Sequence, residues 1–354
     1  MSKRLVSLIT VLACGAAISG LAIAADSDPA KVELKSASAL AFAPGGVLLV
    51  GDTAGGSVWA YETGDKTPGA ATKLEIADLS GKVAALLGTT ADQVAINDVK
   101  VNPVSGKIYL AVSRGKGPDA AAVLLVADQS GKLTEFAQSA KHSRVDLVDR
   151  AGATRRMETI TDVDYVGGKV LVAGLSNEDF NSSLRSLSYP LSAGEKGANI
   201  EMYHGSHGRY ETNSPIRTFL SYTIDGQPVV LAAYTCTPLV KILQSQLVPG
   251  AKVMGTTIAE LGAGNRPLDM VAYKKDGHDY ILMANSARGV MKLDADKLGA
   301  YKPITEPELA KSGVPYVTID GLKGVTQLDK AGDKSAVILV ADAGTTSLRT
   351  IDLP

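Results

Sequence analysis

Short runs of apolar residues separated by polar turns recur along most of the chain. Six of these runs align with one another: VLLVGD, IYLAVS, VLVAGL, VVLAAY, YILMAN and VILVAD. Each run has the length of a strand and is almost unbroken, which is typical of a strand covered on both faces. A turn and another apolar strand precede each run, and a polar loop and a third strand follow it. The pattern therefore predicts six similar units built from strands.

The spacing of these units predicts how they assemble. They recur at roughly 50–60 residues, within the range of propeller repeats. One such sheet cannot bury both of its faces, whereas six sheets set radially bury one another. We therefore predict an all-β fold, a six-bladed β-propeller. The sixth unit ends at Pro354 after its third strand, and the alternating segment KVELK, Lys31–Lys35, is predicted to supply the missing outer strand and close the ring.

Two segments between the units have a different pattern. Residues Asp78–Gln93 have helical spacing, and we expect a helix at the junction of the first and second blades. Residues His142–Thr159 are rich in charge, which predicts a solvated loop or hairpin between the second and third blades.

The N-terminus has the composition of a targeting segment. Lys3 and Arg4 precede an apolar stretch that ends in small residues, and cleavage after Ala24 or Ala25 fits the small-residue rule. The sequence thus predicts a secretory signal over residues 1–25 and a single propeller domain over residues 26–354, located in a bacterial periplasm or secreted. A membrane anchor and a lipid attached to Cys14 are the alternatives. No later segment reaches the roughly 18 apolar residues of a membrane span, so we expect none in the mature chain.

Charge narrows the choice of partners. The chain has 36 basic and 37 acidic residues, without a basic block beyond the N-terminus. This balance argues against nucleic acid. We expect a monomer whose partner is a small-molecule or anionic ligand, or a periplasmic protein.

The segment YHGSHGRY, residues 203–210, carries the first candidate chemistry. His204 and His207 are three residues apart, and Cys236, the one cysteine expected in the mature chain, lies one loop away. Imidazole and thiolate suit copper or zinc, so these three residues are predicted metal ligands on the face of the fourth blade. Arg209 or Arg217 would hold an anionic substrate group. The role is then metal binding itself, or a metal-dependent oxidation or hydrolysis. The alternative is a polar loop that bonds to its own blade, with Cys236 as a small buried hydrophobe.

Two motifs resemble known propeller families. VLLVGDTAGGSVWAY and VILVADAGTTSLRTI resemble NHL-repeat strands, and AINDVKVNPVSGKIYLA resembles the Asn-Asp blade opening of gluconolactonases and paraoxonases. The resemblance covers most of the mature chain at the level of the fold. It implies a calcium ion in the central channel that polarises a lactone or ester carbonyl. The implied ligands are Asn97, Asp98, Asp162 and Asp269.

The sequence departs from that pattern in two places. The first blade offers SASALAF where an acidic ligand would be wanted, and the fourth offers Arg217, whose charge opposes a cation. The aspartates would instead cap strands and pair with Arg217 and Arg266.

A third hypothesis is binding without catalysis. Four arginines fall in loops of the predicted functional face and could hold an anionic ligand or a loop of a partner protein. They are Arg114, Arg217, Arg266 and Arg288.

Overall fold

The computed structural model describes residues 33–69, 72–236 and 238–354, and the part from Glu33 to Pro354 forms one unit. The predicted secretory signal over residues 1–25, including Cys14, lies outside the described residues. Within the described part, no helix is long and apolar enough to cross a membrane.

The structure is almost entirely β, and its strands fall into six sheets. The innermost strands are β1 (Ala39–Ala43), β5 (Val94–Val101), β10 (Asp162–Val166), β15 (Thr218–Ile224), β20 (Pro267–Lys275) and β25 (Val325–Lys330). The second strands are β2 (Val47–Asp52), β6 (Ile108–Arg114), β11 (Lys169–Leu175), β16 (Gln227–Ala233), β21 (His278–Asn285) and β26 (Ser335–Asp342). The third strands are β3 (Ser57–Glu62), β7 (Ala121–Ala127), β12 (Ser182–Ser188), β17 (Pro238–Leu243), β22 (Gly289–Asp294) and β27 (Thr345–Asp352).

A fourth strand lies outside each of these triplets. The fourth strands are β9 (His142–Asp146), β8 (Leu133–Glu135), β13 (Ala198–His204), β19 (Thr256–Glu260), β24 (Tyr316–Thr318) and β4 (Glu75–Ile76). Short additional strands are β14 (Arg209–Glu211), β18 (Lys252–Met254) and β23 (Ser312–Gly313). The helices are α1 (Leu79–Leu86) and the 3-10 turns η1 (Ala91–Gln93), η2 (Gly117–Asp119), η3 (Ala153–Glu158), η4 (Gly205–His207), η5 (Gln244–Gln246) and η6 (Leu298–Ala300).

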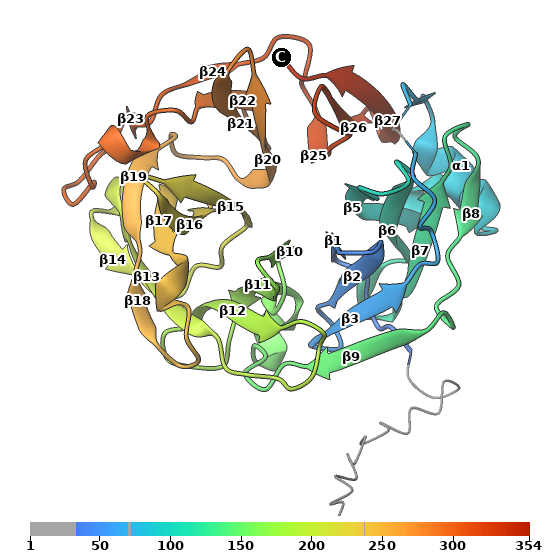
Figure 1. Ribbon diagram of the computed structural model, residues 1–354, viewed down its shortest axis with the longest axis horizontal. Helices are drawn as coiled ribbons and strands as arrows, with labels where there is room; N and C mark the ends of the chain where they lie inside the picture. Colours follow the sequence, from blue (N-terminus) through green and yellow to red (C-terminus); the bar gives the residue numbers. More distant parts are fainter. Residues whose placement is uncertain (1–32, 70–71, 237) are drawn as a thin grey trace, which may run out of the picture. The chain divides into compact units, whose positions relative to one another are not determined.

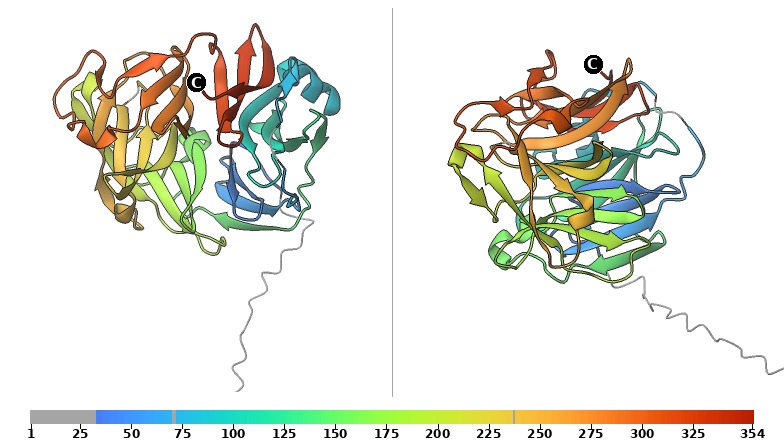
Figure 2. Two further views of the ribbon diagram at one scale, coloured as in Figure 1. Left: turned by 45° about the horizontal axis from the view of Figure 1, so that its top comes forward. Right: turned by 60° about the vertical axis from the view of Figure 1, so that its left-hand side comes forward.

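The sheets form the six blades of a propeller, which confirms the fold predicted from the repeat. In chain order of their innermost strands they are blade one (β1-β2-β3-β9), blade two (β5-β6-β7-β8), blade three (β10-β11-β12-β13), blade four (β15-β16-β17-β19), blade five (β20-β21-β22-β24) and blade six (β25-β26-β27-β4). The strands within a blade pair antiparallel, and the innermost strands face the centre of the ring (Figures 1 and 2). Residues of these strands line a cavity there, which we call the central channel.

The order of blades around the ring differs from their order along the chain. Strand β1 contacts both β10 and β5, and β5 contacts β25. Blade two therefore lies between blades six and one, as the position of β5–β7 in Figure 1 shows. The other blades follow one another in sequence.

The order of the blades and the origin of their outer strands correct three predictions. The outer strand of blade six is β4, paired with β27 through Ile76 and Leu348, so the prediction that Lys31–Lys35 closes the ring is wrong. The helix predicted within Asp78–Gln93 exists, but α1 packs against β27 and β5, at the junction of blades six and two. The segment His142–Thr159, predicted as a solvated loop or hairpin between the second and third blades, begins with β9, which pairs with β3 as the outer strand of blade one. The chain thus ties blades six, two and one together with strands exchanged between them.

The second strands explain why the apolar runs recur. In β16 every residue from Val229 to Ala233 is fully buried, because neighbouring blades cover both faces of each sheet. Burying one such side chain contributes about 1.5–3 kcal/mol relative to leaving it exposed. The radial arrangement therefore buries the apolar side chains on both faces of the second strands.

One buried ion pair lies within this core. The Nε atom of Arg185 on β12 donates to Asp149 Oδ1 at 2.6 Å, and neither side chain is more than 1% exposed. The remaining guanidinium nitrogens donate to the carbonyls of Thr159 and Leu175, and Gly197 N donates to Asp149 Oδ2. The pair thus fixes three loops around β12, since a buried charge is tolerated only when it is paired and fully hydrogen-bonded.

Candidate functional site

A tight hairpin at the outer edge of blade three holds the two histidines. Strand β13 ends at His204, η4 follows, and β14 returns antiparallel to pair Arg209 with His204. Gly208 turns the chain with a φ of +63°, a conformation that favours glycine. The hairpin therefore brings residues 204–211 back onto themselves, at the flank marked by β13 and β14 in Figure 1. This position corrects the prediction that His204 and His207 lie on the face of the fourth blade.

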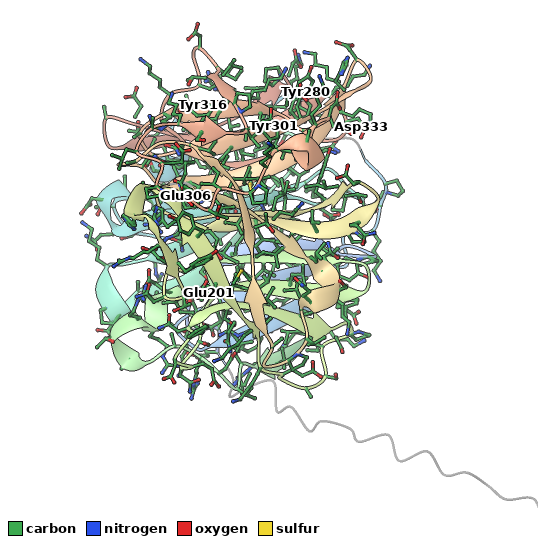
Figure 3. The ribbon with its side chains drawn as sticks, turned by 90° about the vertical axis from the view of Figure 1, so that its left-hand side faces the viewer. Glu201, Tyr280, Tyr301, Glu306, Tyr316 and Asp333 are labelled. Atoms are coloured by element: carbon green, nitrogen blue, oxygen red, sulfur yellow. The ribbon has the colours of Figure 1, made fainter. Side chains whose placement is uncertain are left out.

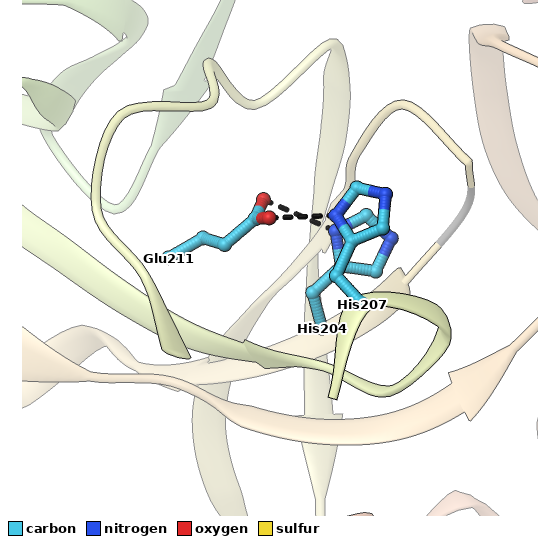
Figure 4. A group of neighbouring side chains, drawn as sticks. All are labelled: His204, His207 and Glu211. Carbon is cyan, nitrogen blue, oxygen red and sulfur yellow. Dashed lines mark hydrogen bonds and ion pairs between the residues drawn. The ribbon is translucent and has the colours of Figure 1, made fainter. Parts of the chain in front are cut away.

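Glu211 joins the two histidines into one group. His204 Nδ1 lies 3.1 Å from Glu211 Oε2, and His207 Nδ1 lies 2.7 Å from Oε1 of the same carboxylate (Figure 4). The two rings are tilted by 42° to each other, with their centroids 3.9 Å apart. One donor atom from each of the three residues lies within 4.8 Å of the others. Among the described residues this is the one group of three or more such side chains with the spacing of a metal site.

Burial differs across this group. The side chains of His204 and Glu211 are 3% and 7% exposed, whereas His207 is 46% exposed. Burial alone would raise the pKa of Glu211, but the hydrogen bonds from both histidines outweigh it and lower the pKa to about 2. Burial lowers the pKa of His204, although Glu211 opposes this shift. At neutral pH the group therefore contains an ionised carboxylate beside a neutral buried imidazole.

Blade four supports the hairpin from behind. Gly205 N donates to Glu260 Oε1 at 2.6 Å, and Thr257 Oγ1 donates to the carbonyl of Tyr203 at 2.6 Å. A Cβ on Gly205 would lie 3.0 Å from Glu260 Cγ, so the fit leaves little room for any other residue. Burial raises the pKa of Glu260 to about 7. This flank is seen face-on in Figure 3, where Glu201 of β13 and Glu306 of the neighbouring loop are labelled.

The other predicted ligand and substrate residues lie in different environments. Cys236 is partly buried in the turn between β16 and β17, where its N–H donates to the carbonyl of Asn265, and it does not belong to the group of His204. Arg209 lies beside the group, with Nε 3.4 Å from Glu211 Oε1 and a side chain 72% exposed. Arg217 is held by Glu158 at 2.9 Å.

The aspartates proposed for calcium lie on innermost strands, where they connect neighbouring blades. Asp98 Oδ2 accepts from Leu40 N at 2.7 Å, Asp162 Oδ2 accepts from Phe219 N at 2.9 Å, and Asp269 Oδ2 accepts from Leu328 N at 3.0 Å. Each carboxylate also accepts from the N–H of the residue that follows it. These hydrogen bonds cap strands, as the alternative hypothesis predicted for the aspartates.

Asn97, the fourth proposed calcium ligand, makes similar contacts. Its amide nitrogen donates to the carbonyl of Ala37 at 2.7 Å and to Ser113 Oγ at 2.9 Å. Its side-chain nitrogen therefore links β5 to the segment that precedes β1 of blade one.

Lys100 places an ammonium group among these carboxylates. Its Nζ lies 3.8 Å from Asp269 Oδ1, and it lines a cavity of about 680 Å³ together with Asp162, Asp164 and Asp329. Burial raises the pKa of Asp98 to about 8, of Asp162 to about 7 and of Asp164 to about 6, although Lys100 opposes each shift. The calcium site stays a prediction. This geometry favours a structural role for the channel aspartates, because their oxygens already accept hydrogen bonds from backbone N–H groups and Lys100 already supplies a positive charge beside them.

Sequence reasoning missed four residues of these two sites. Glu211 was overlooked although it lies four residues after His207, and Lys100 and Asp164 were overlooked although each lies two residues after a residue that had been singled out. Residues two apart on a strand share a face, so that spacing could have found Lys100 and Asp164. Asp329 gave no such signal.

Comparisons with known proteins identify no family for this chain. No family model matches it, and no curated protein matches its sequence. Solved structures overlap 91% of the chain at low similarity. They include an oxidoreductase of the glucose dehydrogenase type from Thermus thermophilus (11% identity, TM-score 0.36, 98% of that chain). Another is the PQQ-bound aldose sugar dehydrogenase of Streptomyces coelicolor (10% identity, TM-score 0.34, 96% of that chain). A third is virginiamycin B lyase of Staphylococcus aureus (8% identity, TM-score 0.32, 98% of that chain). Similarity this low carries no argument about activity.

Proposed function

We propose that this propeller is a metal-binding protein whose zinc or copper ion is held by His204, His207 and Glu211. The observation that supports the proposal most strongly is the convergence of three donor atoms within 4.8 Å from one short hairpin. We further infer that it works in a periplasm or outside the cell, from the secretory segment predicted over residues 1–25. Cell fractionation tests that location.

The donor set suits such an ion. Two imidazoles and one glutamate form the ligand set of zinc sites that keep a fourth position open. Tetrahedral ligands at ~2.0–2.1 Å from zinc are roughly 3.3 Å apart. The imidazoles now lie 3.1 and 2.7 Å from the two oxygens of Glu211, so these distances would widen by about 0.2 and 0.6 Å when the ion binds. Glu211 is ionised and His204 is neutral, which suits metal binding. The ion would displace the Nδ1 protons that the histidines share with Glu211, so we expect its binding to release protons.

The exposure of His207 suggests how a bound ion could act on a ligand. Because His207 is 46% exposed, a ligand oxygen could reach the open coordination position from solvent. The ion would supply a Lewis acid that polarises a carbonyl or activates water. Arg209, exposed beside Glu211, would hold an anionic group of the same ligand. Hydrolysis of an anionic ester is therefore the reaction that we favour for the zinc form.

The test is metal affinity, measured by competition with a chromophoric chelator for zinc and for copper. We expect one ion per chain, and a loss of affinity of about a hundredfold or more in His204→Ala, His207→Ala and Glu211→Gln. His278→Ala is the matched control, because His278 pairs with Asp296 on the surface of blade five and should leave affinity within about twofold.

A second control separates two ligand sets. Cys236→Ser should also leave the affinity unchanged, because Cys236 does not belong to the group of His204. A large loss in Cys236→Ser would instead favour a His-His-Cys site. Binding of calcium alone, abolished by Asp269→Asn, would move the ion to the channel and contradict the proposal.

A further inference from the structure

A cavity of about 660 Å³ lies at the junction of blades five and six. Its wall comes from the turn between β21 and β22, the segment that follows β24, and the start of β25. Pockets of ~300–1,000 Å³ are the usual size for small-molecule sites. None of the residues of the metal-binding group lines it, so this cavity is independent of the proposed metal function.

Positive charge dominates this cavity. Three cationic residues line it, Arg288, Lys311 and Lys323, against one acidic residue, Asp320. In the described part of the chain, none of these three cations forms an ion pair with a carboxylate. Lys311 lies over the ring of Tyr316, with Nζ 4.5 Å from the ring centroid. The cavity therefore presents cationic groups without the anions that would neutralise them.

Arg288 is the residue best placed to bind an anion. Its Nη2 donates to the carbonyl of Ala263 at 3.0 Å, which fixes the plane of the guanidinium. Its Nε is closed off from solvent and has no hydrogen-bond acceptor. An oxygen in the cavity would therefore bond to the terminal nitrogens of the guanidinium rather than to the enclosed Nε. The planar guanidinium of arginine can donate two parallel N–H bonds, which matches the geometry of a carboxylate or phosphate.

We propose that this cavity binds a small organic anion, which Arg288 holds by its carboxylate or phosphate group and Lys323 and Lys311 attract from the rim. Tyr316, Thr318 and Thr326 also line the cavity. The hydroxyls of Tyr316 and Thr326 already donate to the carbonyls of Leu261 and Leu339, so they would accept hydrogen bonds from hydroxyl groups of the ligand. A polyhydroxylated acid or a sugar phosphate is the class that combines both features.

Calorimetric titration with citrate and with inorganic phosphate at low salt tests this site. We expect saturable binding of at least one probe, weakened about tenfold or more by Arg288→Gln and severalfold by Lys323→Gln. The preferred probe separates a carboxylate site from a phosphate site. Lys82→Gln is the control, because it removes one exposed charge on α1, away from the cavity, and should change affinity by less than about twofold.

Two results would overturn the proposal: no saturable binding of either probe, or an equal loss in Lys82→Gln and Arg288→Gln. Thermal unfolding checks that each variant is folded. If Arg288→Gln does not fold, the exposed Lys323 decides, because its loss should weaken binding without affecting the fold. Unchanged affinity in a folded Lys323→Gln would then contradict the site.

Discussion

Replacing Lys100 with methionine removes the ammonium that acts on all five channel aspartates. They are Asp98, Asp162, Asp164, Asp269 and Asp329. Methionine keeps the length and apolar stem of lysine but has no charge. The variant therefore isolates the electrostatic contribution of Lys100 to the closed ring.

The expected loss follows from the distance between Lys100 Nζ and Asp269 Oδ1. Two unit charges 3.8 Å apart interact by about 4 kcal/mol at an effective dielectric constant of ~20. Removing one partner of a buried pair costs about 3–5 kcal/mol. At pH 9, above the raised pKa values of Asp98, Asp162 and Asp164, we expect Lys100→Met to lower the free energy of unfolding by about 3–4 kcal/mol.

The same substitution should cost much less in acid. Burial raises the pKa values of Asp98, Asp162 and Asp164 to about 8, 7 and 6. Because these folded-state values lie above the unfolded value of about 3.9, the stability that these carboxyls contribute is fully present below pH ~4 and is lost as pH rises from there through about 6 to 8. At pH 5 the three groups are mostly neutral, and Lys100 has little negative charge to balance. We expect the loss there to be smaller by about 2 kcal/mol or more.

Urea unfolding at pH 5 and pH 9 measures both values, followed by the fluorescence of Trp59, the single tryptophan, which is buried. Lys73→Met is the control. Lys73 pairs with Asp352 at 3.0 Å, but both side chains are more than 70% exposed, so the loss should stay below about 0.5 kcal/mol at either pH. Equal losses for Lys100→Met at the two pH values would show that Lys100 does not balance the aspartates.

Two further predictions concern buried charged groups in blades three and four. Asp149→Ala leaves the guanidinium of Arg185 buried without its partner, and urea unfolding should show a loss of about 3–5 kcal/mol; a loss below about 1 kcal/mol would mean that Arg185 finds another acceptor or reaches solvent. Glu260→Gln keeps the acceptor for Gly205 N but removes a carboxyl whose pKa burial raises to about 7. Since a raised carboxyl pKa costs stability as pH rises through 7, the variant should gain about 1–3 kcal/mol at pH 9 and little at pH 5. A gain that does not depend on pH would contradict that cause.

The fold could be predicted because its signal is local and repeated. Six runs such as Val229–Ala233 are buried on both faces, and that burial leaves an almost unbroken apolar pattern in the sequence. The ring closure could not be predicted in the same way. Strand β4 has only two residues, Glu75 and Ile76, and β9 is charged, so neither outer strand resembles an apolar strand of the core.

The candidate site was only partly predictable for a similar reason. The histidines at 204 and 207 stand out by their rarity, but their grouping with Glu211 depends on the turn at Gly208, which returns β14 along β13. Cys236 looked close because both segments were assigned to blade four. The hairpin instead extends blade three, and a blade boundary is set by pairing between strands, which spacing along the chain does not specify.

A zinc-edge anomalous difference map from a crystal soaked with zinc tests the proposed metal centre most directly. We expect one strong peak about 2.0–2.2 Å from a nitrogen of His204, a nitrogen of His207 and an oxygen of Glu211. A peak that lies instead beside Cys236 or the channel aspartates, with the hairpin unoccupied, would contradict the assignment.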